Sequence, residues 1–202
     1  NQRALTSAQS LMQFMRDLAA GLAHLHSRGL IHRGIAPANV HYNRGKHNQI
    51  GGLHHATFAE EKLQLDEKRA PDCKFAAAAP DTVITQAFDV WQLGATVLSI
   101  VLGTPTIASV EQSLLALQQN ARTRSGDALP TIFVHMMASC LRPAPEQRPT
   151  AEMLRDSLDC LLKCRATAAD HAHLPNCRTL VLQNALQLLI ATVPTGDATT
   201  SL

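Results

Sequence analysis

The most informative stretch of the sequence spans residues 30–40 and reads Leu30-Ile31-His32-Arg33-Gly34-Ile35-Ala36-Pro37-Ala38-Asn39-Val40. It lies inside a longer interval, from Leu18 through Ala59, that contains neither Asp nor Glu. Magnesium is a hard cation that proteins hold with oxygen ligands, chiefly carboxylates. No shift of alignment within this interval can therefore supply the carboxylates of a magnesium site.

The stretch resembles the catalytic loop of protein kinases, which reads His-Arg-Asp-Leu-Lys-Pro-x-Asn. In that loop the Asp accepts a proton from the substrate hydroxyl, the Lys contacts the transferred phosphate, and the Asn holds a metal ion. The corresponding residues here are Gly34, Ala36 and Asn39. The resemblance implies that the frame of the loop is kept and that two of its three chemical groups are lost.

A second metal-binding motif of kinases, Asp-Phe-Gly, is degenerate in the same way. Its place is taken by Gly52 for the Asp and by Leu53 for the Phe. Asn39 and His41 remain as candidates for a cofactor contact, but a lone amide is a poor magnesium site and His41 stands where the family has an aliphatic residue under adenine. We favour a structural role for Asn39, in starting a strand, and we expect no cofactor.

Local patterns in the first part of the chain agree with this resemblance. Ser7 or Ser10 is expected to cap a helix that Gly29 ends. Residues 40–42 and 48–50 flank a turn that contains glycine, which predicts a short β-hairpin.

The later part of the chain is predicted to be helical. Residues 89–102 form a nearly continuous apolar run, typical of a helix that is covered on all sides. Further helices are expected after Ser109, from Thr131 to Leu141, and from Thr150 to about Leu162. The predicted fold class is mainly α, a protein kinase C-lobe: a helical bundle around a buried central helix, with a short β-hairpin after the catalytic-loop position and no N-lobe in this chain.

Several other positions carry the resemblance and are expected to be structural. Asp89 and Trp91 match the start of the family's central helix, where the Asp accepts backbone N–H bonds from the catalytic loop. Pro80 and Asp81 match the family's Ala-Pro-Glu, and Arg148 matches the Arg that pairs with that Glu. The resemblance therefore implies bonds from Asp89 to the loop and an ion pair between Arg148 and Asp81.

Three residues of the degenerate motifs are assigned to packing rather than chemistry. His32 is expected to be a packing residue and not a base, in a column of side chains that Leu53 keeps dry. In kinases Arg33 would hold a phosphate of the activation segment. Here we expect an exposed or acid-paired arginine.

Two sets of side chains are candidates for binding sites of other kinds. His54 and His55 are able to hold an anion or a transition metal, but two ordinary loop histidines are the favoured interpretation. A second set has the right atoms for zinc but the spacing of no common zinc finger, and we favour ordinary thiols; it comprises Cys160, Cys164, His171, His173 and Cys177.

The composition of the chain indicates which kinds of binding partner to expect. The 202 residues carry a net charge of only +2, with scattered Lys and Arg, so neither nucleic acid nor an anionic membrane is expected as a partner. Charged residues make up 17%, which is low and favours a surface covered by protein partners in a large complex. Five cysteines without a regular framework favour a reducing compartment, so we expect a cytoplasmic location. We predict a kinase-like lobe over residues 1–163, an extension with one extra helix over 164–193, and a disordered tail over 194–202.

The predicted function is that of a pseudokinase, a kinase-like domain that binds other proteins as a scaffold or allosteric partner without transferring phosphate. A structural subunit of a large assembly is a related alternative. The alternative from a different class is a noncanonical kinase that recruits carboxylates from elsewhere, such as Glu60 or Glu61.

Overall fold

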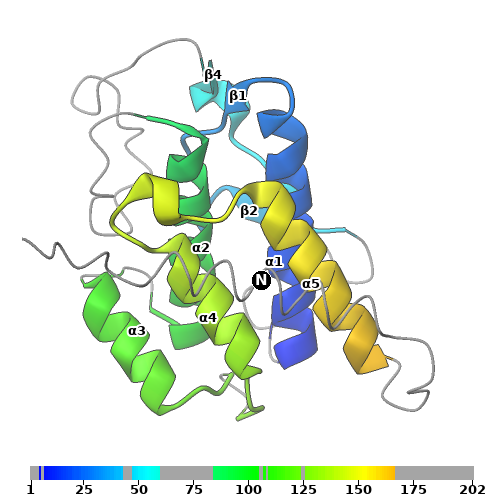
Figure 1. Cartoon of the computed structure of the whole chain (residues 1–202), viewed down its shortest axis with the longest axis vertical. Helices are drawn as coiled ribbons and strands as arrows, with labels where there is room; N and C mark the ends of the chain where they lie inside the picture. Colours follow the sequence, from blue (N-terminus) through cyan, green and yellow to red (C-terminus); the bar gives the residue numbers. More distant parts are fainter. Residues whose placement is uncertain are drawn as a thin grey trace, which may run out of the picture.

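The computed structural model describes residues 5, 7–42, 47–59, 84–104, 107, 109–123 and 126–166. Helices α1 and α2 run along the long axis, and the strand pair β1–β4 lies at one end (Figure 1). The elements in chain order are α1 (Ala8–His26), β1 (Leu30–Ile31), β2 (Val40–His41), β3 (Gln49–Ile50), η2 (Leu53–His55), β4 (Thr57–Phe58), α2 (Gln86–Leu102), α3 (Val110–Gln119), α4 (Thr131–Cys140), η4 (Pro145–Gln147) and α5 (Ala151–Ala166).

Helix α1 begins at a reciprocal cap and ends where the sequence predicted. The Ser7 Oγ accepts the N–H of Ser10 at 3.1 Å, and the Ser10 Oγ accepts the N–H of Ser7 at 3.2 Å. The two alternative caps therefore act together. After the helix, Gly29 has a φ of 72°, a left-handed conformation that costs glycine little.

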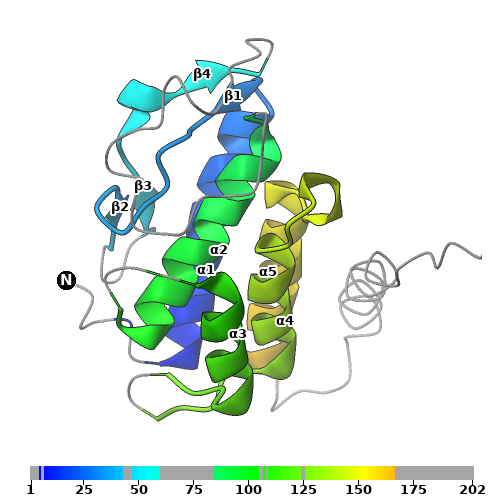
Figure 2. The ribbon, with the colours of Figure 1, turned by 90° about the vertical axis from the view of Figure 1, so that its left-hand side faces the viewer.

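Helix α2 is the buried centre of the molecule. Every residue from Phe88 through Val101 is buried, which confirms the predicted central helix. Figure 2 shows the β2–β3 hairpin on one side of α1 and α2, with α4 and α5 on the other, and α1 contacts α5 while α2 contacts α4. The contact with α4 depends on Gly94, because a Cβ there would lie 2.7 Å from the Cβ of Cys140.

Two short antiparallel strand pairs complete the described part of the chain. The predicted hairpin is present as β2 and β3, in which Val40 pairs with Ile50, although its turn at residues 43–46 lies outside the described residues. The second pair, β1 with β4, places Leu30 opposite Phe58 and was not predicted.

The later helices follow their capping signals. The hydroxyl of Ser109 accepts an N–H at the start of α3, and that of Thr150 does so at the start of α5. Helix α5 continues to Ala166, past the predicted end at Leu162. The predicted extra helix and tail lie within residues 167–202, outside the described residues, and no helix in the described part of the chain is long and apolar enough to cross a membrane.

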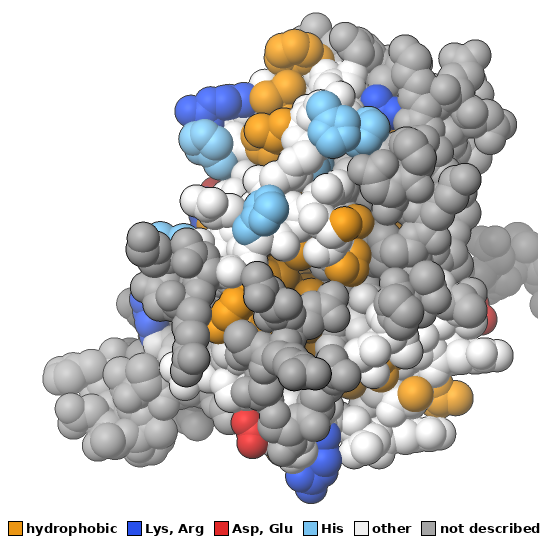
Figure 3. Space-filling model, turned by 180° about the vertical axis from the view of Figure 1, so that it is seen from behind, with side chains coloured by type: hydrophobic (Ala, Val, Ile, Leu, Met, Phe, Trp, Pro, Cys, Tyr) orange, Lys and Arg blue, Asp and Glu red, His pale blue; other side chains and the backbone are white. Residues whose placement is uncertain are grey.

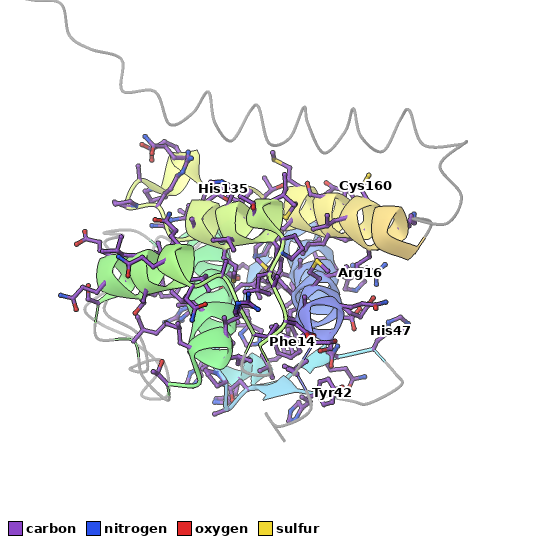
Figure 4. The ribbon with its side chains drawn as sticks, turned by 90° about the horizontal axis from the view of Figure 1, so that it is seen from below. Phe14, Arg16, Tyr42, His47, His135 and Cys160 are labelled. Atoms are coloured by element: carbon purple, nitrogen blue, oxygen red, sulfur yellow. The ribbon has the colours of Figure 1, made fainter. Side chains whose placement is uncertain are left out.

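Two neighbouring charged residues tie α1 to elements on its opposite sides. Arg16 faces α5 (Figure 4), where its Nε and Nη2 donate to the carboxylate of Asp159 at 2.7 and 3.3 Å. Asp17 accepts the backbone N–H of Asn48 at 2.9 Å and its side-chain amide at 2.8 Å. Burial alone would raise the pKa of Asp17, but hydrogen bonds from Asn48, Gln13 and Arg16 outweigh it and hold the pKa below its ordinary value. Asp17 thus fixes the hairpin on α1.

Candidate functional site

The loop between β1 and β2 is anchored by one buried carboxylate of α2. Asp89 is fully buried, with 0% exposure, and its Oδ2 accepts the backbone N–H of His32 at 2.7 Å. Its Oδ1 accepts the N–H of Arg33, also at 2.7 Å. Short bonds to an ionised acceptor are among the stronger hydrogen bonds in proteins. The structure contains the bonds that the sequence predicted for Asp89.

Further polar side chains of α2 continue this anchoring. The Oε1 of Gln92 accepts the N–H of Ile35 at 3.1 Å, and its Nε2 donates to the carbonyl of Arg33 at 3.2 Å. Thr96 Oγ1 donates to the carbonyl of Ile35 at 3.4 Å. Gln92 and Thr96 were not predicted from the sequence, although the spacing of the polar residues in α2 could have indicated them. Asp89, Gln92 and Thr96 recur at helical spacing in a mostly apolar helix, so they share one face.

His26 joins the end of α1 to the same carboxylate. Its Nε2 lies 2.9 Å from the Asp89 Oδ2, and its side chain is 8% exposed. Gln86, at the start of α2, donates to the carbonyl of His26 at 2.8 Å. The end of α1, the loop and the start of α2 therefore meet at Asp89. The role of His26 was not predicted, because no local sequence pattern indicates that it would contact Asp89, which is distant along the chain.

His32 is held in one neutral tautomer. It is fully buried, its Nδ1 accepts the N–H of Gly34 at 3.1 Å, and its Nε2 lies 2.9 Å from the carbonyl oxygen of Gly51. Since the carbonyl is an acceptor only, the proton must be on Nε2. Burial lowers the pKa of His32, and this effect exceeds the opposing influence of Asp89. The ring is thus a packed structural group, as expected, and its nitrogens are both used.

Asn39 is likewise a structural residue in this site. Its side-chain Nδ2 donates to the carbonyl of Gly34 at 2.9 Å, and its own carbonyl accepts the N–H of Gly51 at 2.7 Å. The side chain also fills the space beside Gly52, where an added Cβ would lie 2.8 Å from the Asn39 Cγ. These contacts support the interpretation of Asn39 as the start of the hairpin.

The degenerate centre does not fit a magnesium ion. Gly34, Ala36 and Gly52 provide no ligand side chain, and Asn39 occupies the space between two of them. Within the part of the chain that the structure describes, no three His, Cys, Asp or Glu side chains come together as a metal site. The described residues at these positions therefore do not provide the several oxygen ligands that a hard cation prefers.

Residues 1–158 match the family model for protein tyrosine and serine/threonine kinases. The chain belongs to the protein kinase family. Its helical bundle, central α2 and anchored loop are the family's C-lobe fold, which confirms the predicted fold class.

Individual kinases match over most of this chain but only a small part of their own length. A tyrosine-protein kinase receptor TYRO3 of Danio rerio is 29% identical over 77% of this chain and 18% of its own. A serine/threonine-protein kinase/endoribonuclease IRE1 of Oryza sativa subsp. japonica is 31% identical over 74% and 18%. An inactive serine/threonine-protein kinase PLK5 of Mus musculus is 26% identical over 76% and 26%.

One prediction about the kinase motifs was wrong. Leu53, expected to pack beside His32, is 53% exposed, because it lies in the short η2 turn at the surface and nothing in the described residues covers it. Arg33 was expected to be either exposed or acid-paired, and the exposed alternative is excluded because the residue is only 7% exposed. Its backbone has a φ of 66°, unusual for a residue other than glycine, and the bonds to Asp89 and Gln92 hold it there.

Arg148 is buried and bound to backbone carbonyls. Its guanidinium donates to the carbonyls of Arg142 at 2.7 Å, Ala87 at 3.0 Å and Pro143 at 3.0 Å. These bonds join the turn before α5 to the start of α2. The predicted partner Asp81, with Pro80, lies outside the described residues, so that ion pair stays a prediction. Trp91 is buried in α2 at 5% exposure.

The remaining candidate ligands do not assemble into a described site. His41 is exposed, and the rings of His54 and His55 lie 4.0 Å apart, tilted by 51°. Figure 3 shows histidine and hydrophobic side chains together on one face. Cys160 is buried at 3% exposure. The side chains of the other zinc candidates lie outside the described residues; these are Cys164, His171, His173 and Cys177. Glu60 and Glu61, the acids of the alternative kinase prediction, also lie outside them.

A described cleft of about 640 Å³ lies away from the degenerate motifs. It runs beside the start of α2 and the η4 turn, and its walls include His26, Val90 and Arg148. None of the four positions where the kinase chemistry would lie contributes to its lining.

Proposed function

We propose that this chain is a catalytically inactive kinase-like domain that acts as a protein-binding scaffold or allosteric partner. One contrast supports this proposal. The carboxylate that organises the loop is present, as Asp89, whereas Gly34 and Gly52 stand where kinases have the carboxylates that carry out the chemistry. The frame is intact and its reactive groups are absent.

Two acids that hold the loop and the hairpin in place are already engaged. Asp17 accepts four hydrogen bonds, from Asn48, Gln13 and Arg16. Asp89 accepts two backbone N–H groups and contacts His26. Diverting either carboxylate to a cation would leave buried donors without acceptors, which is costly. Neither is therefore a substitute for the lost groups.

Among the relatives, the mouse protein is named an inactive kinase, and the others described above are named kinases. A kinase-like fold is therefore compatible with loss of activity. Since the chain spans 18% of the zebrafish relative, activity elsewhere in a longer protein is a separate question.

Helix α3 is a described surface suited to a protein partner. Leu115 is 55% exposed, Leu114 beside it is half-buried, and Glu111 is the helix's one charged residue. An apolar side chain among neutral polar ones loses little on desolvation and gains by burial. We propose that α3 is part of the contact surface.

The activity claim is tested with the purified protein of complete natural sequence, Mg²⁺ and γ-labelled ATP. We expect no phosphate transfer to itself or to general kinase substrates above a no-protein control. Magnesium-dependent transfer that disappears in a Glu60→Gln/Glu61→Gln variant would establish the alternative, a kinase with relocated carboxylates.

The contact surface is tested with two matched variants. Leu115→Asp and Leu53→Asp change leucines of nearly equal exposure, 55% and 53%, on different elements. Cross-linking of the natural complex should place a partner against α3, and Leu115→Asp should weaken the complex while Leu53→Asp leaves it unchanged. The reverse pattern would exclude α3 and indicate the face around η2.

A further inference from the structure

We propose that the face formed by the end of α1 and the β2–β3 hairpin docks an extended acidic segment of a partner protein. We call it the basic face and define it by His24 and Arg28 at the end of α1 and His47 beside β3. The inference deepens the proposed function, on which it rests for the expectation that the partner is a protein. It adds a contact surface on different elements from α3, for a ligand of defined charge.

The charge of the chain is divided unevenly along the sequence. The interval from Leu18 to Ala59 holds four of the 18 Lys and Arg residues, seven of the 10 His residues and none of the 16 Asp and Glu residues. Its net charge is therefore +4 with His neutral, whereas the rest of the chain has −2. The basic face is built from this interval. An acidic segment would supply the negative charges that the interval lacks.

Helical spacing aligns the basic face along one side of α1. Asp17 accepts the backbone N–H of Asn48 at 2.9 Å. A Cβ on Gly21 would lie 3.5 Å from the Cδ1 of Ile50. Strand β3 therefore lies along the side of α1 that carries these two positions. His24 follows Asp17 by seven residues, which is nearly two helical turns, so it continues the same side beyond the hairpin.

Arg28 and His24 are exposed and contact each other. The Nη1 of Arg28 lies 2.9 Å from the Nδ1 of His24 and donates to its carbonyl at 3.2 Å. Among the described residues no carboxylate contacts either side chain, whereas Arg16 and Arg155 are each bonded to an aspartate. Since a guanidinium has five N–H donors, Arg28 can bind a carboxylate through those that remain.

His47 extends the basic face along the hairpin. Its side chain is 84% exposed and points away from the helical bundle, with its Nδ1 3.6 Å from the Oδ1 of Asp17 (Figure 4). Asp17 already accepts four hydrogen bonds, so it holds His47 only weakly. From Asp17 to the end of α1 at His26 is about 14 Å, at 1.5 Å per residue. An extended segment of about four residues covers this length.

The described charged groups of neighbouring elements do not neutralise the basic face. Asp17 of α1 and Asp89 of α2 are buried, and their hydrogen bonds hold the hairpin and the loop. Arg16 is paired with Asp159 of α5. His41 is exposed in β2 and can only add positive charge. Histidine gains its charge between about pH 8 and pH 5, so acidification should strengthen the attraction for an acidic segment.

The first test uses the protein of complete natural sequence and a fluorescein-labelled hexaglutamate peptide, whose fluorescence anisotropy reports binding. Arg28→Glu should weaken binding about five-fold, because an attraction becomes a repulsion. Arg122→Glu is the matched control, since Arg122 is also exposed, is bonded to the Gly126 carbonyl, and changes the net charge equally. Equal weakening by both variants, or no binding of the peptide, would overturn the proposal. Circular dichroism checks folding, and Arg28→Gln replaces Arg28→Glu if that variant does not fold.

The second test follows the same peptide as a function of pH. Binding should tighten about three-fold between about pH 7.5 and pH 6, and His24→Gln/His47→Gln should remove most of that gain. A gain that is unchanged in the double variant would exclude these two histidines from the contact and would also overturn the proposal.

Two further measurements identify the class of ligand and separate this inference from the proposed function. A single-stranded DNA of about 12 nucleotides that binds more tightly than the peptide, and is weakened by Arg28→Glu, would refute the acidic protein segment in favour of nucleic acid. Leu115→Asp on α3 should leave peptide binding unchanged, and a loss there equal to that of Arg28→Glu would count against a separate surface. Phosphate transfer by the natural protein would overturn the proposed function without altering peptide binding.

Discussion

Replacing Asp89 by Asn tests whether one buried carboxylate organises the loop. The substitution keeps the shape of the side chain but turns one acceptor oxygen into an NH₂ donor. Both oxygens of Asp89 now accept a backbone N–H at 2.7 Å, from His32 and Arg33. In either orientation of the new amide, one of these N–H groups therefore faces another donor.

The magnitude follows from these contacts. A hydrogen bond to a charged group contributes about 1.5–3 kcal/mol, and a buried donor left without an acceptor costs about 1–3 kcal/mol. The two terms overlap, so we expect Asp89→Asn to lower the free energy of unfolding by about 2–4 kcal/mol. For a chain of this size that corresponds to a Tm lower by about 5–15 °C.

The assay is thermal unfolding monitored by circular dichroism, together with measurement of hydrogen exchange at the His32 and Arg33 amides. Both amides should lose protection in Asp89→Asn, because their shared acceptor is lost. Asp127→Asn changes an exposed aspartate outside the loop and serves as the control. A Tm within about 2 °C of the natural protein, with both amides still protected, would refute the reasoning.

Three further substitutions or treatments test other contacts. Gly94→Ala should cost about 1–3 kcal/mol in denaturant unfolding, because its Cβ would lie 2.7 Å from that of Cys140; unchanged stability would contradict this close packing. Hydrogen bonds hold the folded pKa of Asp17 below its ordinary value, so its carboxylate stabilises the fold above the unfolded pKa and loses that effect as pH falls through the folded pKa. The stability difference between the natural protein and Asp17→Asn should therefore be full at about pH 6 and shrink below about pH 4, and a constant difference would argue against it. Burial raises the pKa of Cys140 to about 12, so mass spectrometry should find its peptide alkylated by iodoacetamide only after unfolding; rapid labelling of the native protein would be contrary.

The elements that could be predicted are those specified by local signals. A serine before an apolar periodic segment marked the start of α1 and of α3, and the structure shows the caps at Ser7 and Ser109. The apolar run of α2 predicted a helix buried on all sides, even though it did not indicate which elements would cover it. Such patterns depend only on neighbours within a few residues, so the sequence contains them directly.

The features that could not be predicted depend on contacts between distant parts of the chain. The β1–β4 pair joins Leu30 to Phe58 through strands of two residues, too short to show an alternating pattern. Similarity to a kinase position suggested a packed Leu53, but burial depends on what lies over the side chain, and Leu53 is exposed. His26 meets Asp89 only because α1 and α2 are packed side by side.

In kinases, the carboxylate that anchors the loop and the carboxylates that carry out the chemistry have separate physical roles. The loop can therefore keep its structure when the second group is lost. Asp89 satisfies buried N–H groups, so its loss leaves them unpaired. Carboxylates at positions 34 and 52 would instead both lie against Asn39, since a Cβ at either position would be within 3.6 Å of that side chain. Without a cation between them, two such like charges repel, and each would hold the other's pKa up. If the domain binds no metal, as we propose, glycine at these positions avoids that repulsion, and the Asn39 amide lies beside both of them as a neutral group.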